Sequence, residues 1–298
     1  MKVVHSMEEI PKLEEPIALS IGVFDGVHLG HQMIFKRLNK LTRKGGTSVI
    51  LTFSNHPSTH LTPNSPVPLL TSLDHRLKLL KKQPIDLAIV LPFNEEIANQ
   101  SYSSFFGNLR THLPFKHLIV GEDARFGKGR SGGPDQIKAL GWDTEYLSKE
   151  TLHKEEISSG LIRHYLEERN LKKVKKMLGR PYSISLPFGP LDVIRENEVQ
   201  YKWVTGTKKL CLLPSAVYAV DLHINDQTIP AIAFYRGTQN ISGETEVSLT
   251  LYFEKEIKEG EEMEIVFISY LHDELDPDFG LSSKANLLET LKPEFFPS

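Results

Sequence analysis

Apolar residues in the first 180 positions follow two alternating patterns. Short, nearly continuous apolar runs, typical of buried strands, occupy residues 17–24, 48–53, 86–91, 117–120 and 144–147. Between them, apolar residues recur at helical spacing in residues 32–41, 74–82, 102–109, 134–140 and 158–177. We expect Asp74 to cap one helix, Pro134 to open another and Asn170 to break the last. The alternation predicts an α/β domain with a parallel sheet and right-handed crossovers.

The pattern changes after the segment Gly179-Arg180-Pro181. Strand-like segments separated by turn residues follow at 182–186, 199–204, 217–224, 229–234, 246–253 and 264–268. They predict a small barrel or sandwich, closed by a helix over residues 281–291. We therefore expect one domain over residues 1–180 and a β domain over residues 181–298.

Composition narrows the possible functions. The chain has 298 residues and a net charge of -3, which does not favour a broad electrostatic grip on nucleic acid. The single cysteine, Cys211, excludes an internal disulfide and a zinc site built on several cysteines. The polar N-terminus lacks the apolar region of a signal peptide, and no long uncharged apolar stretch predicts a membrane helix. We expect a cytoplasmic protein that binds small molecules and neither membrane nor nucleic acid; its oligomeric state stays open.

The first segment with chemical potential is GVFDGVHLGH, residues 22–31, which follows a predicted strand and opens a predicted helix. Its glycines let the backbone approach a phosphate chain, and the unpaired N–H groups of a helix start favour an anion. His28 and His31 are three residues apart, so both rings can lie on one side of the loop and bind phosphate oxygens. A glycine turn with two solvated histidines is the alternative.

The second segment is ISSGLIR, residues 157–163. Ser158 or Ser159 can cap the helix that follows, and this role alone would explain both hydroxyls. The functional alternative is a second anion site, in which the helix amides, a serine hydroxyl and Arg163 hold the β- and γ-phosphates of a nucleotide.

Six segments occur in a characteristic order: GVFDGVHLGHQ, TFSNHP, LLTSLDHRLKLL, VGEDARFGKGRSGG, ISSGLIR and LGRPY. In order and spacing, residues 16–182 resemble the prokaryotic bifunctional riboflavin kinase/FAD synthetases. The resemblance implies a Rossmann-like HxGH nucleotidyltransferase domain that makes FAD from FMN and ATP, with Mg²⁺ on the phosphates. It also implies a following small β-barrel domain of the riboflavin kinase type.

The resemblance assigns roles to particular residues, none of them as a direct metal ligand. The implied catalytic residues are His28, His31 and Arg163. The implied nucleotide- and flavin-binding residues are Gly22, Phe24, Asp25, Gly30, Asn55, His56, Pro57, Asp123, Arg125, Phe126, Gly127, Ser158 and Ser159.

Three positions depart from the family pattern. Asn55 replaces a proline, and an Asx-turn would keep that loop in shape. Ala124 replaces a phenylalanine and removes an aromatic face, whereas Gly160 replaces a threonine and removes one hydroxyl.

The C-terminal half departs much further from the family. The glycine-rich turn and the GFPTAN segment, whose Thr and Asn hold Mg²⁺–ATP in the kinase, are missing; residues 191–212 read LDVIRENEVQYKWVTGTKKLCL instead. We therefore expect a folded domain that is a poor or inactive riboflavin kinase. Glu246 is the candidate general base by resemblance, and a solvated strand carboxylate is the alternative.

Three other functions stay open at this point. The chain is compatible with a bifunctional enzyme that also phosphorylates riboflavin, with another HxGH adenylyl- or cytidylyltransferase, and with a non-catalytic flavin or nucleotide sensor.

Overall fold

The computed structural model describes residues 1–152, 155–187, 192–195, 198–205, 210–239, 245–253 and 262–273. The chain divides into two compact units, one of Met1–Leu69 with Leu73–Ser159 and one of Leu70–Ser72 with Gly160–Ser298. The units meet along the chain at residue 160, whereas the sequence pattern changes near residue 180. The domain boundary expected at residue 180 stays a prediction.

The first unit is built on a six-stranded sheet in which every neighbouring pair of strands is parallel. The strand order is β1-β4-β3-β2-β5-β6. The strands are β1 (Lys2–Val4), β2 (Ile17–Ile21), β3 (Thr47–Phe53), β4 (Leu87–Leu91), β5 (His117–Gly121) and β6 (Asp143–Leu147). The order reverses between β2 and β5, and open α/β sheets bind ligands at the carboxyl ends of the strands beside such a reversal.

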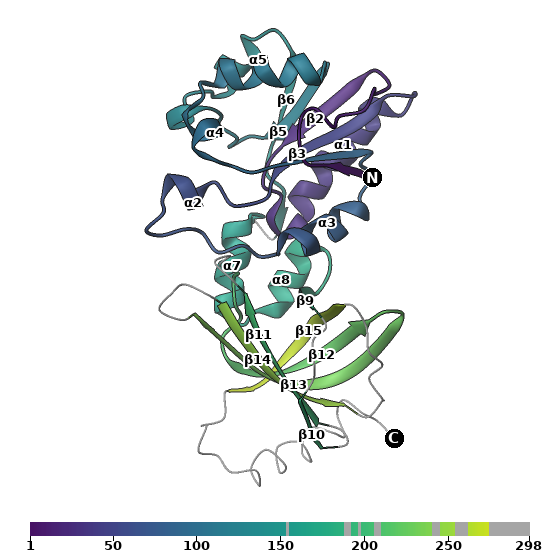
Figure 1. The fold of residues 1–298 in the computed structure, drawn as a ribbon, viewed down its shortest axis with the longest axis vertical. Coiled ribbons are helices and arrows are strands. Elements are labelled where there is room, and N and C mark those ends of the chain that lie inside the picture. Colours follow the sequence, from purple (N-terminus) through teal and green to yellow (C-terminus); the bar gives the residue numbers. More distant parts are fainter. Residues whose placement is uncertain are drawn as a thin grey trace. The chain divides into compact units, whose positions relative to one another are not determined.

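Helices cover both faces of this sheet (Figure 1). The longer ones are α1 (Leu29–Thr42), α3 (Leu73–Lys81) and α5 (Tyr102–His112). The shorter ones are η1 (Asp25–Val27), α2 (Ser58–Leu61), α4 (Glu95–Asn99), η2 (Lys128–Arg130) and α6 (Pro134–Lys138). A two-stranded hairpin of β7 (Thr151–Leu152) and β8 (Glu155–Glu156) completes the unit.

Alternate residues of the central strands enter two separate cores. Leu19 packs in the cluster that holds Phe106 of α5, and its neighbour Ala18 packs in the cluster that holds Phe35 of α1. Every residue of β2 and of β3 is buried, which explains why these strands are continuous apolar runs and do not alternate with polar residues.

Two of the three expected helix boundaries are confirmed. Pro134 opens α6, and Asn170 caps α8 (Leu171–Leu178) by accepting the backbone N–H of Lys173. The cap expected at Asp74 is wrong, because α3 already begins at Leu73 and Asp74 lies in its first turn. The Asp74 carboxylate still interacts favourably with the positive, N-terminal end of the helix dipole of α3.

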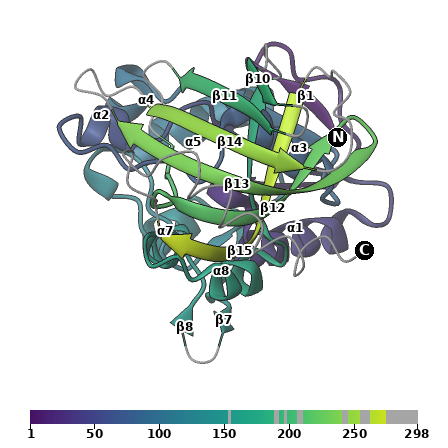
Figure 2. The same cartoon turned by 90° about the horizontal axis from the view of Figure 1, so that it is seen from below.

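The second unit holds most of α7 (Ser159–Glu167), all of α8, and a seven-stranded antiparallel sheet. Its strand order is β10-β11-β14-β13-β12-β15-β9, and the middle strands lie side by side in Figure 2. The strands are β9 (Tyr182–Pro187), β10 (Asp192–Arg195), β11 (Glu198–Thr205), β12 (Ala216–Ile224), β13 (Gln227–Gln239), β14 (Thr245–Phe253) and β15 (Glu262–Asp273). The six predicted strands are all present, and β10 was not predicted.

The molecule is thus a parallel α/β fold followed along the chain by a small antiparallel β domain, as the sequence predicts. The helix expected over residues 281–291 lies outside the described residues. Within the described part of the chain, none of the helices has the length and hydropathy needed to cross a membrane.

Candidate functional site

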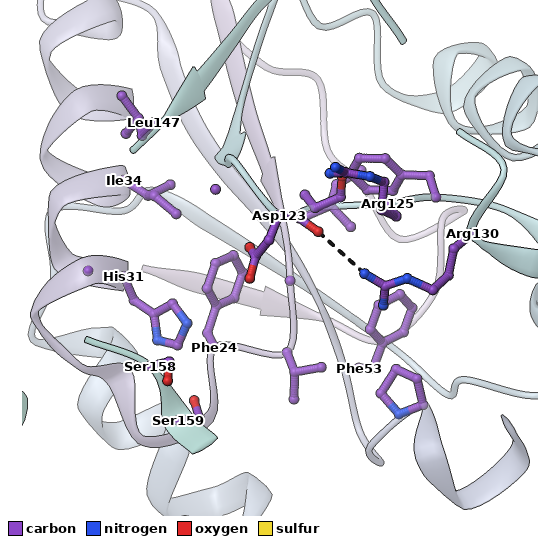
Figure 3. A pocket seen from close by; sticks show the side chains of 18 of the residues that line it. Phe24, His31, Ile34, Phe53, Asp123, Arg125, Arg130, Leu147, Ser158 and Ser159 are labelled. Atoms are coloured by element: carbon purple, nitrogen blue, oxygen red, sulfur yellow. Dashed lines mark hydrogen bonds between the residues drawn. The ribbon is translucent and has the colours of Figure 1, made fainter. Parts of the chain in front are cut away.

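A cavity of about 560 Å³ opens in the first unit where β2, β3, β5 and β6 end. Backbone and side chains of Gly22, Phe53, Gly121 and Leu147 line it. This is the carboxyl edge of the sheet beside the reversal in strand order. Figure 3 shows His31, Ser158 and Ser159 on one side of the cavity and Asp123, Arg125 and Arg130 on another.

The loop that leaves β2 has an unusual backbone. Phe24 and Val27 both adopt positive φ, 52° and 47°, where side chains crowd the backbone and a β-branched residue is rare. Each such residue costs about 1–3 kcal/mol and persists only where its surroundings hold it. The Thr52 hydroxyl donates to the carbonyl of Val23, and the Gln32 amide donates to that of Val27, both at 3.1 Å. The strained loop is therefore braced from β3 and α1.

The two histidines of this loop stack on each other. Their ring centroids lie 3.6 Å apart with an interplanar angle of 20°. His28 caps α1, and its Nδ1 accepts the backbone N–H of His31 at 3.4 Å. The expectation that both rings lie on one side of the loop is confirmed. A Cβ at Gly30 would come within 3.2 Å of the His28 ring, a tight contact that would require the ring to shift by a few tenths of an ångström.

Burial lowers the pKa of His31 well below its usual 6.5, and the neighbouring His28 and Arg76 lower it further. The ring is therefore neutral near pH 7. Its Nδ1 is buried, and the described residues offer that atom no hydrogen-bond partner. A buried ring nitrogen with no protein partner is suited to a polar ligand, because burial without a partner costs free energy.

The start of α7 lies against the same loop. The Ser159 hydroxyl donates to the carbonyl of Asp25 at 2.9 Å, and both Ser158 and Ser159 line the cavity. The Asp25 side chain is buried, and Asp25 is not among the lining residues. Arg163 follows Ser159 by one turn of α7 and belongs to the second unit. Its role in nucleotide binding stays a prediction.

The loop after β5 forms another wall. All four residues that the sequence selects there, Asp123, Arg125, Phe126 and Gly127, line the cavity. Gly127 has a φ of +72°, and a Cβ there would lie 2.3 Å from the backbone nitrogen of Tyr102. Only glycine fits this turn, which explains its place in the segment.

Two cations that the sequence analysis did not select also line this region. Arg130 donates to the carbonyl of Asp123 at 3.5 Å (Figure 3). Lys149 contacts the carboxylates of Asp123 at 3.5 Å and Glu156 at 2.9 Å, and the hydrogen bond to Glu156 raises the pKa of Lys149. Arg130 lies in the segment VGEDARFGKGRSGG, which the resemblance includes. Lys149 follows β6 and lies in none of the six segments, so nothing in the sequence was a reason to select it.

Of the segment TFSNHP, only Pro57 among the three selected residues lines the cavity. Asn55 does not form the expected Asx-turn, because its side chain pairs with the backbone of Phe93. It donates to the Phe93 carbonyl at 2.9 Å and accepts the Phe93 N–H at 2.8 Å. The Nδ1 atom of His56 contacts the Ser58 hydroxyl at 2.7 Å. Asn55 and His56 therefore shape the loops beside the cavity, and Phe93 itself lines it.

Part of the cavity lining is apolar. It includes Phe53, Leu61, Phe93, Ile97, Ala98, Phe105 and Ala124. Phe53 and Phe93 meet edge to face with centroids 5.3 Å apart. A flat aromatic ligand can pack against such side chains while its polar groups reach the other walls.

Metal binding by side chains alone is not indicated in the described residues, which hold no cluster of three or more His, Cys, Asp or Glu side chains. Asp123 and Glu150 are the carboxylates on the cavity lining. Glu246 lies in β14 of the second unit, and its side chain is outside the described part of the structure. Its role as a kinase base stays a prediction.

Comparison with known proteins identifies the family. The FAD synthetase family model matches residues 10–161, slightly more than half of the chain. The chain belongs to the FAD synthetase family.

Curated relatives of this FAD synthetase family member are named bifunctional riboflavin kinase/FMN adenylyltransferase. The protein from Buchnera aphidicola subsp. Schizaphis graminum is 32% identical over 74% of this chain and 73% of its own length. The one from Listeria monocytogenes is 28% identical over 86% of this chain and 84% of its own. A solved structure titled macrolide-efflux protein, from Streptococcus pneumoniae, has a TM-score of 0.79 at 20% identity and covers 98% of this chain and 97% of its own. At that identity, the likeness supports the fold alone.

Proposed function

We propose that this protein is an FMN adenylyltransferase, which transfers AMP from ATP to FMN to give FAD and pyrophosphate. The observation that carries the proposal is the stacked pair His28 and His31, which lies at the start of α1 on a cavity whose lining is partly apolar and aromatic. One cavity thus offers donors for phosphates and a surface for a flavin ring. Membership in the FAD synthetase family supports the same reaction.

The proposed step is a single displacement without a covalent enzyme intermediate. A phosphate oxygen of FMN attacks the α-phosphorus of ATP and forms a new P–O bond. The bond from that phosphorus to the oxygen bridging the α- and β-phosphates breaks, and pyrophosphate leaves with the electron pair. Such chemistry depends on positioning and charge stabilisation and needs no protein nucleophile.

His28, His31 and the N–H groups at the start of α1 are assigned to the phosphate under attack. A neutral His31 donates through one ring nitrogen, and a donor fixed in place before the reaction needs no rearrangement as charge develops. Ser158 and Ser159, at the start of α7, are assigned to the leaving pyrophosphate, together with Arg163. Arg125 is assigned to the wall that receives the flavin substrate.

Mg²⁺ is assigned to the phosphates of ATP. This ion keeps several waters and is bound through one or two carboxylates plus substrate phosphates, so a full set of protein ligands is not required. Asp123 and Glu150 are the lining carboxylates available to it. Its chemical contribution is to offset the negative charge of the phosphates.

Riboflavin phosphorylation is the second candidate activity, because the relatives from Buchnera and Listeria carry riboflavin kinase in their names. We propose that this activity is weak or lost here, since the GFPTAN segment that binds the metal nucleotide is missing from residues 191–212. The antiparallel domain would then contribute to binding or assembly.

One experiment separates the candidates. The purified chain is incubated with Mg²⁺ and ATP plus either FMN or riboflavin, and the flavins are separated by chromatography. We expect FAD from FMN and no FMN from riboflavin. FMN from riboflavin would favour the bifunctional enzyme, and tight FMN binding without pyrophosphate release would favour a sensor. If neither flavin reacts or binds, the proposal is wrong.

A further inference from the structure

Arg76 of α3 is a charged residue with 0% of its surface exposed; it lies in the segment LLTSLDHRLKLL, and the proposed chemistry does not use it. We propose that Arg76 is a positioning residue: it ties the loop after β2 to the end of β3 and thereby holds the histidine pair in the conformation that binds a nucleotide. The inference rests on the proposed function for its link to adenylyl transfer, and it adds a residue outside the cavity to that site.

The contacts of the guanidinium define this role. Its Nη1 donates to the carbonyl of Val23 at 2.9 Å, and its Nη2 donates to the carbonyl of Phe53 at 2.5 Å. Val23 and Phe53 both line the cavity, and each lies where the chain leaves its strand. One planar side chain, which does not itself line the cavity, therefore holds the loop after β2 and the end of β3 at a fixed separation.

The fork geometry explains why the position is occupied by arginine. Two donors on one rigid plane can serve two separate carbonyls, whereas the ammonium of a lysine is a single point of charge. The carbonyl of Val23 also accepts a hydrogen bond from the Thr52 hydroxyl, so it would keep one donor if Arg76 were replaced. The carbonyl of Phe53 would lose the hydrogen bond that Arg76 donates to it. Buried carbonyls without a donor are unfavourable, and the chain would move to satisfy them.

A buried cation is costly and calls for compensation. Asp25, itself buried in η1, acts on Arg76 electrostatically and raises the pKa of the guanidinium, although burial has the larger, opposite effect. Within the described residues, Nε of Arg76 has no hydrogen-bond partner. If this position served only for packing, an apolar side chain would suit it better, because burying an apolar group avoids the free-energy cost of removing a charge from water.

The charge also acts on the cavity. Arg76 and His28 are the charged or titratable groups that act on His31, and both lower the pKa of that ring in addition to its burial. A fixed positive charge behind the loop favours a polyanionic ligand in front of it.

The test uses the full chain and compares Arg76→Met, Arg76→Lys and the control Arg110→Met. Arg110 lies on α5 in the same unit, exposed, with its guanidinium 5.6 Å from the centre of the Trp142 ring. We measure ATP affinity by calorimetry, the titration of His31 by NMR, and kcat and KM for FAD formation.

We expect Arg76→Met to weaken ATP binding by about tenfold or more and to shift the His31 titration to higher pH, because two charged hydrogen bonds and a nearby cation are lost. Arg76→Lys should keep the His31 titration low but recover only part of the ATP affinity, because lysine restores the charge and not the fork. Arg110→Met should match the wild type in all three measurements.

A folded Arg76→Met protein with unchanged ATP affinity and His31 titration would overturn the proposal. If neither Arg76 variant folds, the residue serves the fold alone and the proposal is also overturned. A wild type that binds ATP but makes no FAD would refute the proposed function and leave the role of Arg76 to be judged by affinity and titration.

Discussion

The depressed pKa of His31 predicts that the first unit loses stability in mild acid. Folding holds the pKa of His31 well below 6.5, whereas the unfolded chain titrates near 6.5. Between the two pKa values the unfolded state binds more protons, so the free energy of unfolding falls as the pH falls through this window. Above pH 6.5 the ring is neutral in both states, and its contribution no longer changes with pH.

The size of the effect follows from the same linkage. Lowering the pH from 7.5 to 5.5 should cost up to about 1.4 kcal/mol through His31, because the unfolded ring takes up its proton across this range and the folded ring takes up less; one pKa unit corresponds to about 1.4 kcal/mol. Histidine-to-glutamine substitution removes the titrating group, so His31→Gln should lack this part of the loss even if the variant is less stable at every pH.

The assay is urea unfolding at pH 7.5, 6.5 and 5.5, followed by the fluorescence of Trp142 in a Trp203→Phe background. Trp142 belongs to the first unit and packs against Phe106 and Phe115, so its emission reports that unit. Titrating groups that do not interact with His31 are shared by the two proteins and cancel in the difference, which therefore reports His31 together with its coupling to His28. If wild type and His31→Gln lose the same free energy between pH 7.5 and 5.5, the reasoning about His31 is wrong.

Three further predictions concern the loops around the cavity. His28→Ala should lower kcat for FAD formation by about 10²–10³-fold, the usual effect of losing one fixed transition-state donor, and a kcat within about twofold of wild type would contradict the assignment. Gly127→Ala should lower the melting temperature by calorimetry, with a cost of at least about 1–3 kcal/mol, because its φ is +72° and its Cβ would meet Tyr102. Its control, Gly107→Ala in α5, has open space and should gain about 0.5–1 kcal/mol; equal melting temperatures would contradict the steric argument. Ser159→Ala should raise the KM for ATP more than the KM for FMN in steady-state assays, because it releases α7 from Asp25; equal changes in both would count against that role.

The sequence predicted the central strands well because both faces of β2 and β3 are buried, so their apolar runs are unbroken. It did not predict β1, which has three residues and pairs at the sheet edge with β4 alone. Three residues are too few to show the apolar pattern by which a strand is recognised in a sequence. The helix break at Asn170 was predictable because its amide serves as a local cap.

The site was predictable where the signal is local and less so where contacts join distant segments. The placement of His28 and His31 on one side of the loop follows from their spacing, and their stacking is a finding of the structure. The pairing of Asn55 with Phe93 joins positions 38 residues apart, and no local rule reveals it. Arg76 lies in the segment LLTSLDHRLKLL and shares the buried face of α3 with Leu79 and Leu80. Its place in that segment and a charge at an apolar position were the available signals.

The left-handed backbone at Phe24 and Val27 has a consequence for ligand affinity. Because η1, α1 and β3 already hold this loop in its strained shape, an arriving nucleotide does not have to order it. The conformational entropy of the loop is lost during folding and not on binding. The contacts between the nucleotide and the loop therefore contribute more fully to the affinity. Preorganisation of this kind predicts fast association and little change in the loop between the free and the bound protein.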